Sequence, residues 1–245
     1  MSVLREVGFP HKNDVKVVSN CVLTVGASPW PFATTYASEI EAHWQNASAA
    51  NPAYFNGIVH LIDDLRMVGS ELHASLIRTE FKNYLYWRAL GFPDAGVIDG
   101  FGCAVIRSSD GQFMLAIQRP GHVNSGFVYL PSGFIDERDV GADGTIDIGA
   151  SVTREIDEEI GEAGNDLRRE EGFIVVRSGV QLGLAVPFHA PMTADAFVAR
   201  VGDHNARSDD PELEAVIPVA SLDDLQDLKM LPYARALLEA LLAAH

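Results

Sequence analysis

Hydrophobic residues recur at every fourth position of one segment in the second half of the chain. They are Ile148, Val152, Ile156 and Ile160. Successive residues of an α-helix are rotated by about 100°, so this spacing keeps the four side chains on one side of a helix. Charged residues fill most other positions near the end of the segment. The pattern therefore predicts an amphipathic helix over residues 148–160 that buries its apolar side.

Shorter apolar runs on both sides of this helix predict strands. Runs rich in β-branched and aromatic residues occur at 15–25, 58–62, 71–77, 97–107, 112–119, 127–130, 173–177, 181–189 and 215–219. Helical spacing predicts further helices at 38–49, within 80–94, at 194–202 and at 232–242, with Ser38 and Ser221 as capping residues. Two prolines in residues 28–32 predict a turn without regular structure.

Three glutamates share one side of the predicted helix. Glu155, Glu158 and Glu159 fall within about 100° of arc and border the apolar side, where a cleft can form. Neighbouring carboxylates repel each other unless a cation lies between them. Oxygen ligands suit a hard divalent ion, Mg²⁺ or Mn²⁺, better than zinc. A Glu-rich face exposed to solvent is the alternative interpretation.

The residues around this helix match a longer motif. An apolar strand at 127–130 leads into Pro-Ser-Gly, and after a polar loop the helix ends in "REIDEEIG". This pattern resembles the Nudix hydrolase box, which is Gly, five residues, Glu, seven residues, then Arg-Glu-aliphatic-x-Glu-Glu-x-Gly-aliphatic. The matching residues are Gly133, Arg154, Glu155, Ile156, Glu158, Glu159 and Gly161. The resemblance implies an α/β fold, the Nudix α/β/α sandwich with a mixed sheet.

The same resemblance implies a metal site. Its expected ligands are the Gly133 carbonyl and the carboxylates of Glu155, Glu158 and Glu159, which would bind Mg²⁺ or Mn²⁺. Arg154 would orient the glutamates through a salt bridge and need not touch the substrate.

Two further residues are candidates for substrate binding. Arg119, at the end of a predicted strand, would hold a phosphate by a forked contact, or is an ordinary surface arginine. Nudix proteins often place an additional acid before a late strand, as an extra ligand or base. Glu212 is the candidate here and Glu214 is nearly as good, although either is equally compatible with an exposed surface position.

The spacing of the box departs from the family. Twenty residues separate Gly133 from Arg154, where the family has thirteen. If residues 140–146 ("VGADGTI") are the seven-residue insertion, Asp139 falls where the first Glu of the box belongs. Glycines in this stretch predict a mobile surface loop that carries no metal ligand. The box is thus expected at 133–161.

The region before the box carries a weaker resemblance. Residues 51–57 ("NPAYFNG") predict a turn, because Asn-Gly tolerates positive φ. Together with residues 80–94 they also resemble the N-terminal region of the Nudix branch that hydrolyses UDP-glucose. This implies an α+β extension over residues 1–95, packed against a Nudix domain over residues 96–245. Its aromatics would stack on a base or pack in the core: Trp30, Tyr54, Phe55 and Trp87.

Composition narrows the range of partners. The 245 residues are 47% hydrophobic and carry a formal net charge of −16, with 34 acids against 18 bases. This charge disfavours nucleic acids and anionic membranes as partners, whereas cations can bridge an acidic protein to an anionic substrate. Two cysteines are too few for a disulfide framework, and no run of about 18 apolar residues is present. We expect a cytoplasmic protein, and a homodimer stays open.

These observations predict an enzyme that hydrolyses the diphosphate of a nucleoside diphosphate linked to another group. A UDP-sugar such as UDP-glucose, cleaved to UMP and sugar 1-phosphate, is the first expectation for this small-molecule substrate. CoA derivatives and ADP-ribose are the alternatives. A catalytically silent Nudix fold that senses a ligand is the rival class, although such proteins usually lose the Arg-Glu and Glu-Glu pairs that are complete here.

Overall fold

The computed structural model describes residues 5–7, 14–121, 123–209 and 211–244. The chain divides into two compact units that alternate along the sequence. Unit 1 comprises Met1–Phe9, Asn20–Gly100 and Phe134–Ile148. Unit 2 comprises Pro10–Ser19, Phe101–Gly133 and Gly149–His245. The chain passes from unit 1 to unit 2 after Gly100, close to the predicted boundary at 95/96. Two shorter segments, Pro10–Ser19 and Phe134–Ile148, also belong to a different unit from their neighbours in sequence, so a single boundary does not separate the two units.

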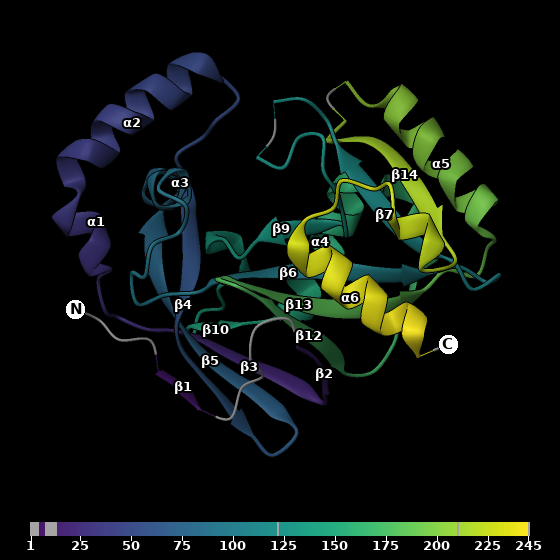
Figure 1. Ribbon diagram of the computed structural model, residues 1–245, viewed down its shortest axis with the longest axis horizontal. Helices are drawn as coiled ribbons and strands as arrows, with labels where there is room; N and C mark the ends of the chain where they lie inside the picture. The colour runs from purple at the N-terminus through teal and green to yellow at the C-terminus, as the bar shows by residue number, and fades with distance from the viewer. Residues whose placement is uncertain (1–4, 8–13, 122, 210, 245) are drawn as a thin grey trace. The chain divides into compact units, whose positions relative to one another are not determined.

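Unit 1 is built on a five-stranded mixed sheet in the order β1-β4-β5-β3-β10 (Figure 1). The β1–β4 and β3–β5 pairs are parallel, whereas β4–β5 and β10–β3 are antiparallel. Its elements are β1 (Arg5–Val7), β3 (Asn20–Val25), α1 (Pro31–Thr35), α2 (Ala37–Ala50), β4 (Ile58–Val68), β5 (Glu71–Glu80), α3 (Phe81–Ala89), the 3₁₀ turn η1 (Glu137–Asp139) and β10 (Thr145–Ile146).

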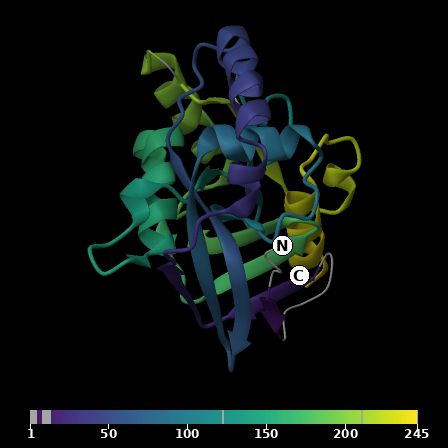
Figure 2. The same ribbon diagram turned by 90° about the vertical axis from the view of Figure 1, so that its left-hand side faces the viewer.

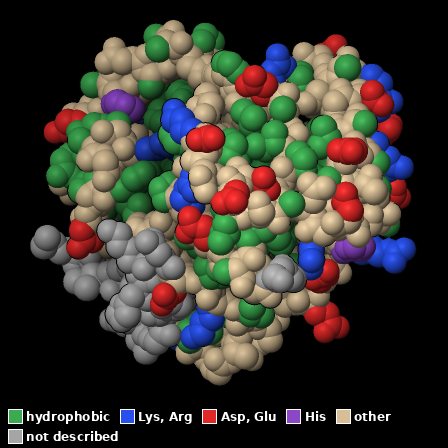
Figure 3. Space-filling model, turned by 45° about the vertical axis from the view of Figure 1, so that its right-hand side comes forward, with side chains coloured by type: hydrophobic (Ala, Val, Ile, Leu, Met, Phe, Trp, Pro, Cys, Tyr) green, Lys and Arg blue, Asp and Glu red, His purple; other side chains and the backbone are tan. Residues whose placement is uncertain are grey.

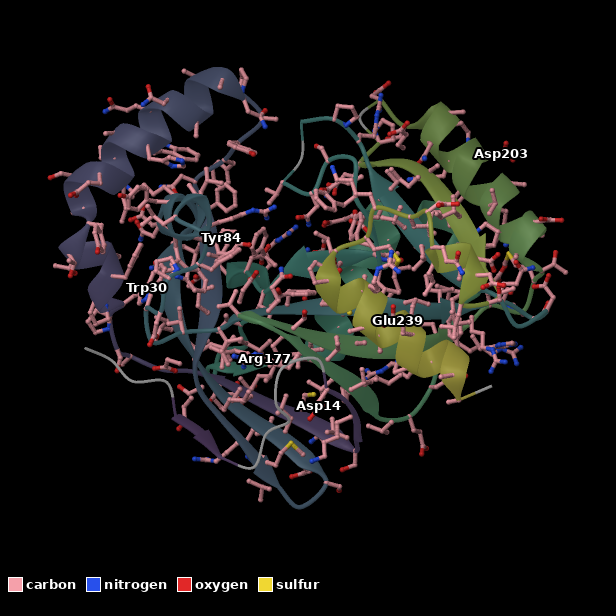
Figure 4. All side chains as sticks on the ribbon, viewed as in Figure 1. Asp14, Trp30, Tyr84, Arg177, Asp203 and Glu239 are labelled. Atoms are coloured by element: carbon pink, nitrogen blue, oxygen red, sulfur yellow. The ribbon has the colours of Figure 1, made fainter. Side chains whose placement is uncertain are left out.

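Aromatic residues fill the core of unit 1 around α3. Trp30 and Trp87 are 2% and 0% exposed and meet edge to face, with ring centroids 5.6 Å apart. Figure 4 labels Trp30 and Tyr84, which belong to this cluster. Both tryptophans therefore pack in the core, which is one of their two predicted roles. Phe55, by contrast, is 81% exposed.

The predicted turn of residues 51–57 falls at residues 51–54, where the Tyr54 amide donates to the Asn51 carbonyl (3.1 Å), and the Asn56-Gly57 pair instead serves α3. The Asn56 side chain accepts a hydrogen bond from the backbone amide of Lys82 (2.9 Å) and donates one to the Glu80 carboxylate (2.6 Å). The Gly57 carbonyl accepts from the Phe81 amide (2.8 Å). Since the first amides of a helix have no partner within it, Asn56 caps α3 from a distant segment.

Unit 2 is built on a nine-stranded sheet in the order β14-β7-β6-β13-β12-β2, with β8, β9 and β11 paired beside it. Its elements are β2 (Val15–Val18), β6 (Asp99–Arg107), β7 (Phe113–Gln118), β8 (Val128–Tyr129), β9 (Ser132–Phe134), α4 (Ile148–Glu159), η2 (Gly161–Ala163), β11 (Arg168–Arg169), β12 (Phe173–Ser178), β13 (Gln181–His189), α5 (Ala194–Arg207), β14 (Leu213–Val219), η3 (Asp223–Leu225) and α6 (Pro232–Ala243). The elements β6, β9 and α4 begin or end just across a unit boundary.

Helices lie on both sides of the strands of unit 2. Helix α6 packs on β12, β13 and β2, and α5 packs on β14. Figure 2 shows α4 (teal) and α6 (yellow) on opposite sides of the green strands. The four aliphatic residues that predicted α4 are between 0% and 2% exposed. The predicted α/β fold, with a mixed sheet and a layer of helices on each side, is confirmed.

Several predicted elements need correction. The strand expected at 15–25 is interrupted at Ser19, and its parts, β2 and β3, join different sheets. The turn expected at 28–32 instead starts α1, because Pro31 occupies the first helical turn, where no amide partner is needed. Ser38 does not cap α2, whose N-cap residue is Tyr36.

The predicted insertion at 140–146 is not a free loop. Thr145 and Ile146 form β10, which pairs with Thr24 and Leu23 of β3. The Val25 amide also donates to the Gly144 carbonyl (2.8 Å). Ile146 is buried, at 4% exposure, so the hairpin is anchored by backbone pairing and by one apolar side chain. The prediction of a mobile loop is therefore wrong.

Acidic and hydrophobic side chains are mixed on the surface that Figure 3 presents. Figure 3 shows Asp and Glu side chains (red) spread over the face that it presents, among hydrophobic side chains (green). In the part of the chain described above, no helix is long and apolar enough to cross a membrane.

Candidate active site

The last turn of α4 is fixed by a glycine. Gly161 follows the helix with φ of 63°, in the left-handed region that favours glycine. A Cβ at this position would also collide with the His204 imidazole of α5. The "REIDEEIG" sequence thus ends its helix at Glu159, so the three glutamates occupy the final turns of α4.

Glu159 is buried next to a tyrosine. It is 2% exposed, and its Oε1 accepts a hydrogen bond from the hydroxyl of Tyr129 (3.2 Å). Its Oε2 is buried and makes no hydrogen bond of ordinary geometry with any described residue. A buried carboxylate oxygen without a partner is costly, so this atom needs an explanation.

Burial and neighbouring charges raise the pKa of the Glu159 carboxyl well above its ordinary value. Loss of hydration is the largest cause, and the negative charges of Glu155 and Glu212 act in the same direction. The Tyr129 hydroxyl and the Ser132 backbone amide oppose this rise less strongly. Glu155 and Glu212 therefore each lie close enough to Glu159 for their charge to act on it, although Glu212 is 53 positions further along the chain than Glu159.

Arg154 engages the other two glutamates of the motif. Its Nη1 lies 2.7 Å from Oε1 of Glu155 and 3.4 Å from Oε2 of Glu158. The Glu158 side chain is 41% exposed, whereas that of Glu155 is 13% exposed. The salt bridges expected for Arg154 are thus present, and its orienting role stays a prediction.

Gly133 lies directly against Glu155. A Cβ at residue 133 would overlap with the Glu155 carboxyl group. Only glycine lets β9 approach α4 this closely. The first residue of the box and its first helical glutamate, 22 positions apart, thus come together in unit 2.

The structure separates the two candidates for the additional acid. Glu212 precedes β14, where its carbonyl accepts a hydrogen bond from the Arg119 amide (3.0 Å), and its carboxylate acts on Glu159 as described above. Glu214 is exposed, at an irregularity between Leu213 and Ala215. Glu212 is therefore the better candidate of the two.

Arg119 is engaged locally. Its Nη1 donates to the carbonyl of Pro211 (3.3 Å), and the Ser125 hydroxyl donates to its backbone carbonyl (2.9 Å). These bonds tie the end of β7 to the segment that carries Glu212. A phosphate contact from Arg119 stays a prediction.

The donor set fits a hard divalent cation. Within the described ranges, no three His, Cys, Asp or Glu side chains are grouped as metal ligands. The motif glutamates are instead engaged by Arg154 and Tyr129. Carboxylate oxygens are nevertheless the ligands that Mg²⁺ and Mn²⁺ prefer, and the unpartnered Oε2 of Glu159 is an acceptor that a cation would satisfy.

Sequence reasoning missed Tyr129. It lies in the apolar run 127–130, which was interpreted only as a strand leading into the box. A signal was present, because the hydroxyl of a buried tyrosine usually has a hydrogen-bond partner.

Among known proteins, the chain shows similarity only to solved structures. No protein-family model and no curated protein matches the chain. A Nudix hydrolase from M. smegmatis, RenU, is 16% identical with a TM-score of 0.38, over 59% of this chain and 83% of its own. The MutT protein from Methanosarcina mazei is 20% identical with a TM-score of 0.38, over 58% and 90%.

A third similar structure is the NUDIX domain of Shewanella oneidensis NrtR complexed with ADP ribose. It is 17% identical with a TM-score of 0.36, over 65% of this chain and 96% of its own. At these values, similarity does not assign a function. The function is therefore argued from the residues of the site.

Proposed function

We propose that this protein is a Nudix-type hydrolase that cleaves the diphosphate of a nucleoside diphosphate linked to another group. The observation that carries the proposal is the buried Glu159 carboxylate, with one unpartnered oxygen beside the charges of Glu155 and Glu212. Gly133 lies against Glu155, and Arg154 is paired with two motif glutamates. The motif and the geometry thus support the same site.

Glu155, Glu158, Glu159 and the carbonyl of Gly133 would hold Mg²⁺ or Mn²⁺. When bound, such an ion neutralises charge on a diphosphate and lowers the pKa of a coordinated water. Binding would satisfy Oε2 of Glu159 and reduce the repulsion among the carboxylates.

The chain's own residues supply orientation and a base. Arg154 fixes the directions of Glu155 and Glu158 through its two ion pairs. The carboxylate of Glu212 makes no hydrogen bond or ion pair with a described residue. It is therefore free to accept a proton from an attacking water, as a general base requires.

The preferred substrate in this proposal is a UDP-hexose, cleaved to UMP and a hexose 1-phosphate. It rests on the resemblance of residues 51–57 and 80–94 to the UDP-glucose branch. The capping of α3 by Asn56 supports a structural role for this segment in unit 1 and identifies no base-binding residue. The nature of the nucleotide therefore has to be measured.

A substrate panel tests the proposal. UDP-glucose, ADP-ribose and CoA are incubated with the protein and Mg²⁺ or Mn²⁺, and released phosphate esters are quantified. We expect turnover that requires the cation and is lost in Glu158→Gln. Asp157→Asn is the matched control, because Asp157 is an exposed acid on the same helix.

Three outcomes would contradict parts of the proposal. Full turnover by Glu158→Gln would remove the metal assignment. Tight binding of a nucleotide without turnover would favour the ligand sensor. A kcat/KM for ADP-ribose or CoA at least about tenfold above that for UDP-glucose, about 1.4 kcal/mol in transition-state binding, would reject the UDP-sugar while leaving the hydrolase.

A further inference from the structure

The Tyr129 hydroxyl lies inside unit 2 and points at a carboxylate. Tyr129 belongs to β8, where it pairs with Ala116 of β7, and it is 0% exposed. Its hydroxyl donates to Oε1 of Glu159 at 3.2 Å. Both groups are buried, so this hydrogen bond is shielded from competition with water.

Glu159 occupies an unfavourable position for a carboxylate. It is the last residue of α4, where the partial negative charge of the helix C-terminus opposes another negative charge. The carboxylates of Glu155 and Glu212 add repulsion, and Oε2 makes no hydrogen bond of ordinary geometry with any described residue. A site that serves only stability would place a cationic or apolar partner here.

We propose that Tyr129 is a positioning residue that holds Oε1 of Glu159, so that Oε2 is presented to a divalent cation. This inference rests on the proposed function and adds a residue outside the predicted motif. The hydroxyl restricts rotation of the carboxyl group by binding one oxygen and leaving the other available.

The choice of a tyrosine matters for charge. A neutral hydroxyl fixes the carboxylate without cancelling its charge, so the attraction for a cation is retained. A lysine or arginine at this position would satisfy Glu159 and compete with the metal. The arginine of the motif instead pairs with Glu155 and Glu158.

The test measures cation binding directly. Mn²⁺ is titrated calorimetrically into metal-free wild-type protein and into Tyr129→Phe. We expect about tenfold weaker binding in the variant, the effect typical of losing a group that orients a metal ligand. In turnover assays, the variant should need about tenfold more Mn²⁺ for half-maximal activity.

A matched control exists in unit 1. The Tyr84 hydroxyl donates to Oδ2 of Asp99 at 3.1 Å, and both residues are 2% exposed. Tyr84→Phe removes the same kind of buried hydrogen bond from a pair outside the proposed site, and it should leave Mn²⁺ affinity unchanged. Should Tyr129→Phe not fold, 4-fluorophenylalanine at position 129 fills the hydroxyl volume without donating a hydrogen bond.

The outcomes separate the two hypotheses. Equal Mn²⁺ affinity, within about twofold, in wild type and Tyr129→Phe would overturn the positioning role and leave the proposed function intact. An equal loss in Tyr84→Phe would also overturn it, by showing a general effect of destabilisation. Absence of Mn²⁺ binding in the wild type would reject the proposed metal site itself.

Discussion

Without divalent cations, the variant Glu159→Gln is expected to be more stable than the wild type. The substitution replaces a buried carboxylate by a neutral amide of nearly the same shape. Its oxygen can keep the hydrogen bond from Tyr129, while the charge that faces Glu155 and Glu212 is removed. The gain in stability comes from removing this repulsion and from burying a neutral amide, which costs less free energy to dehydrate than an ion.

The size of the gain follows from the unpartnered Oε2 atom. Leaving a buried polar group without a partner costs about 1–3 kcal/mol, and charged groups cost more. The amide nitrogen in the variant also lacks a partner, and its cost offsets part of the gain from removing the charge. We therefore expect a net increase of about 1–3 kcal/mol in the free energy of unfolding. For a chain of this length, 1 kcal/mol shifts Tm by about 2–4 °C.

The effect of pH has a defined sign. The folded-state pKa of Glu159 is raised, mainly by burial. Its protonated form therefore stabilises the fold at pH values below the ordinary glutamate pKa, and this contribution is lost as pH rises through the raised pKa. The advantage of Glu159→Gln should grow over that window and then level off.

The assay is thermal unfolding in EDTA and in Mn²⁺. In EDTA, Glu159→Gln should have the higher Tm, whereas Asp157→Asn on the exposed side of α4 should differ little from wild type. Mn²⁺ at 100 times its Kd should stabilise the wild type by about 2.7 kcal/mol and the Glu159 variant much less. A lower Tm for Glu159→Gln in EDTA would refute the reasoning.

Three further outcomes are expected. Deleting residues 141–144 should lower Tm by disrupting the hairpin that anchors β10, while Mn²⁺ affinity measured by calorimetry persists; loss of binding by a folded deletion variant would place a ligand in the hairpin. Asn56→Ala removes the cap of α3 and should cost about 1 kcal/mol in urea unfolding, whereas an unchanged midpoint would contradict the capping role. The Cys103 thiol is 0% exposed and burial raises its pKa far above the ordinary value, so it should react with a thiol reagent only after denaturation; rapid labelling of the native protein would contradict that burial.

Local patterns predicted the elements whose environment is uniform along their length. The four-residue spacing of Ile148 to Ile160 identifies α4, and the proline and apolar run of residues 232–242 identify α6. The two hairpins β6–β7 and β12–β13 are equally clear, because each has apolar strands beside a short polar turn. Periodicity is a local property, and these elements follow it.

Contacts between segments distant in the sequence could not be predicted from local patterns. The glycine-rich residues 140–146 carry no strand signal, and β10 forms because β3 offers an edge with free backbone groups. Likewise the sequence favours Glu212 only slightly over Glu214, and only the start of β14 decides which one lies near Glu159. Pairing and proximity of this kind depend on the whole fold.

The alternation of the two units along the chain has a consequence for protein synthesis. Domains usually fold in order as they leave the ribosome. Here unit 1 cannot complete its sheet until β10 at residues 145–146 has been made, after β6 and β7 of unit 2 have been made but before β12, β13 and β14. The nine-stranded sheet in turn incorporates β2 from the start of the chain. Neither unit can therefore finish folding before the other in the order in which the chain is synthesised. A nascent chain halted near residue 100 would expose unpaired strands to chaperones.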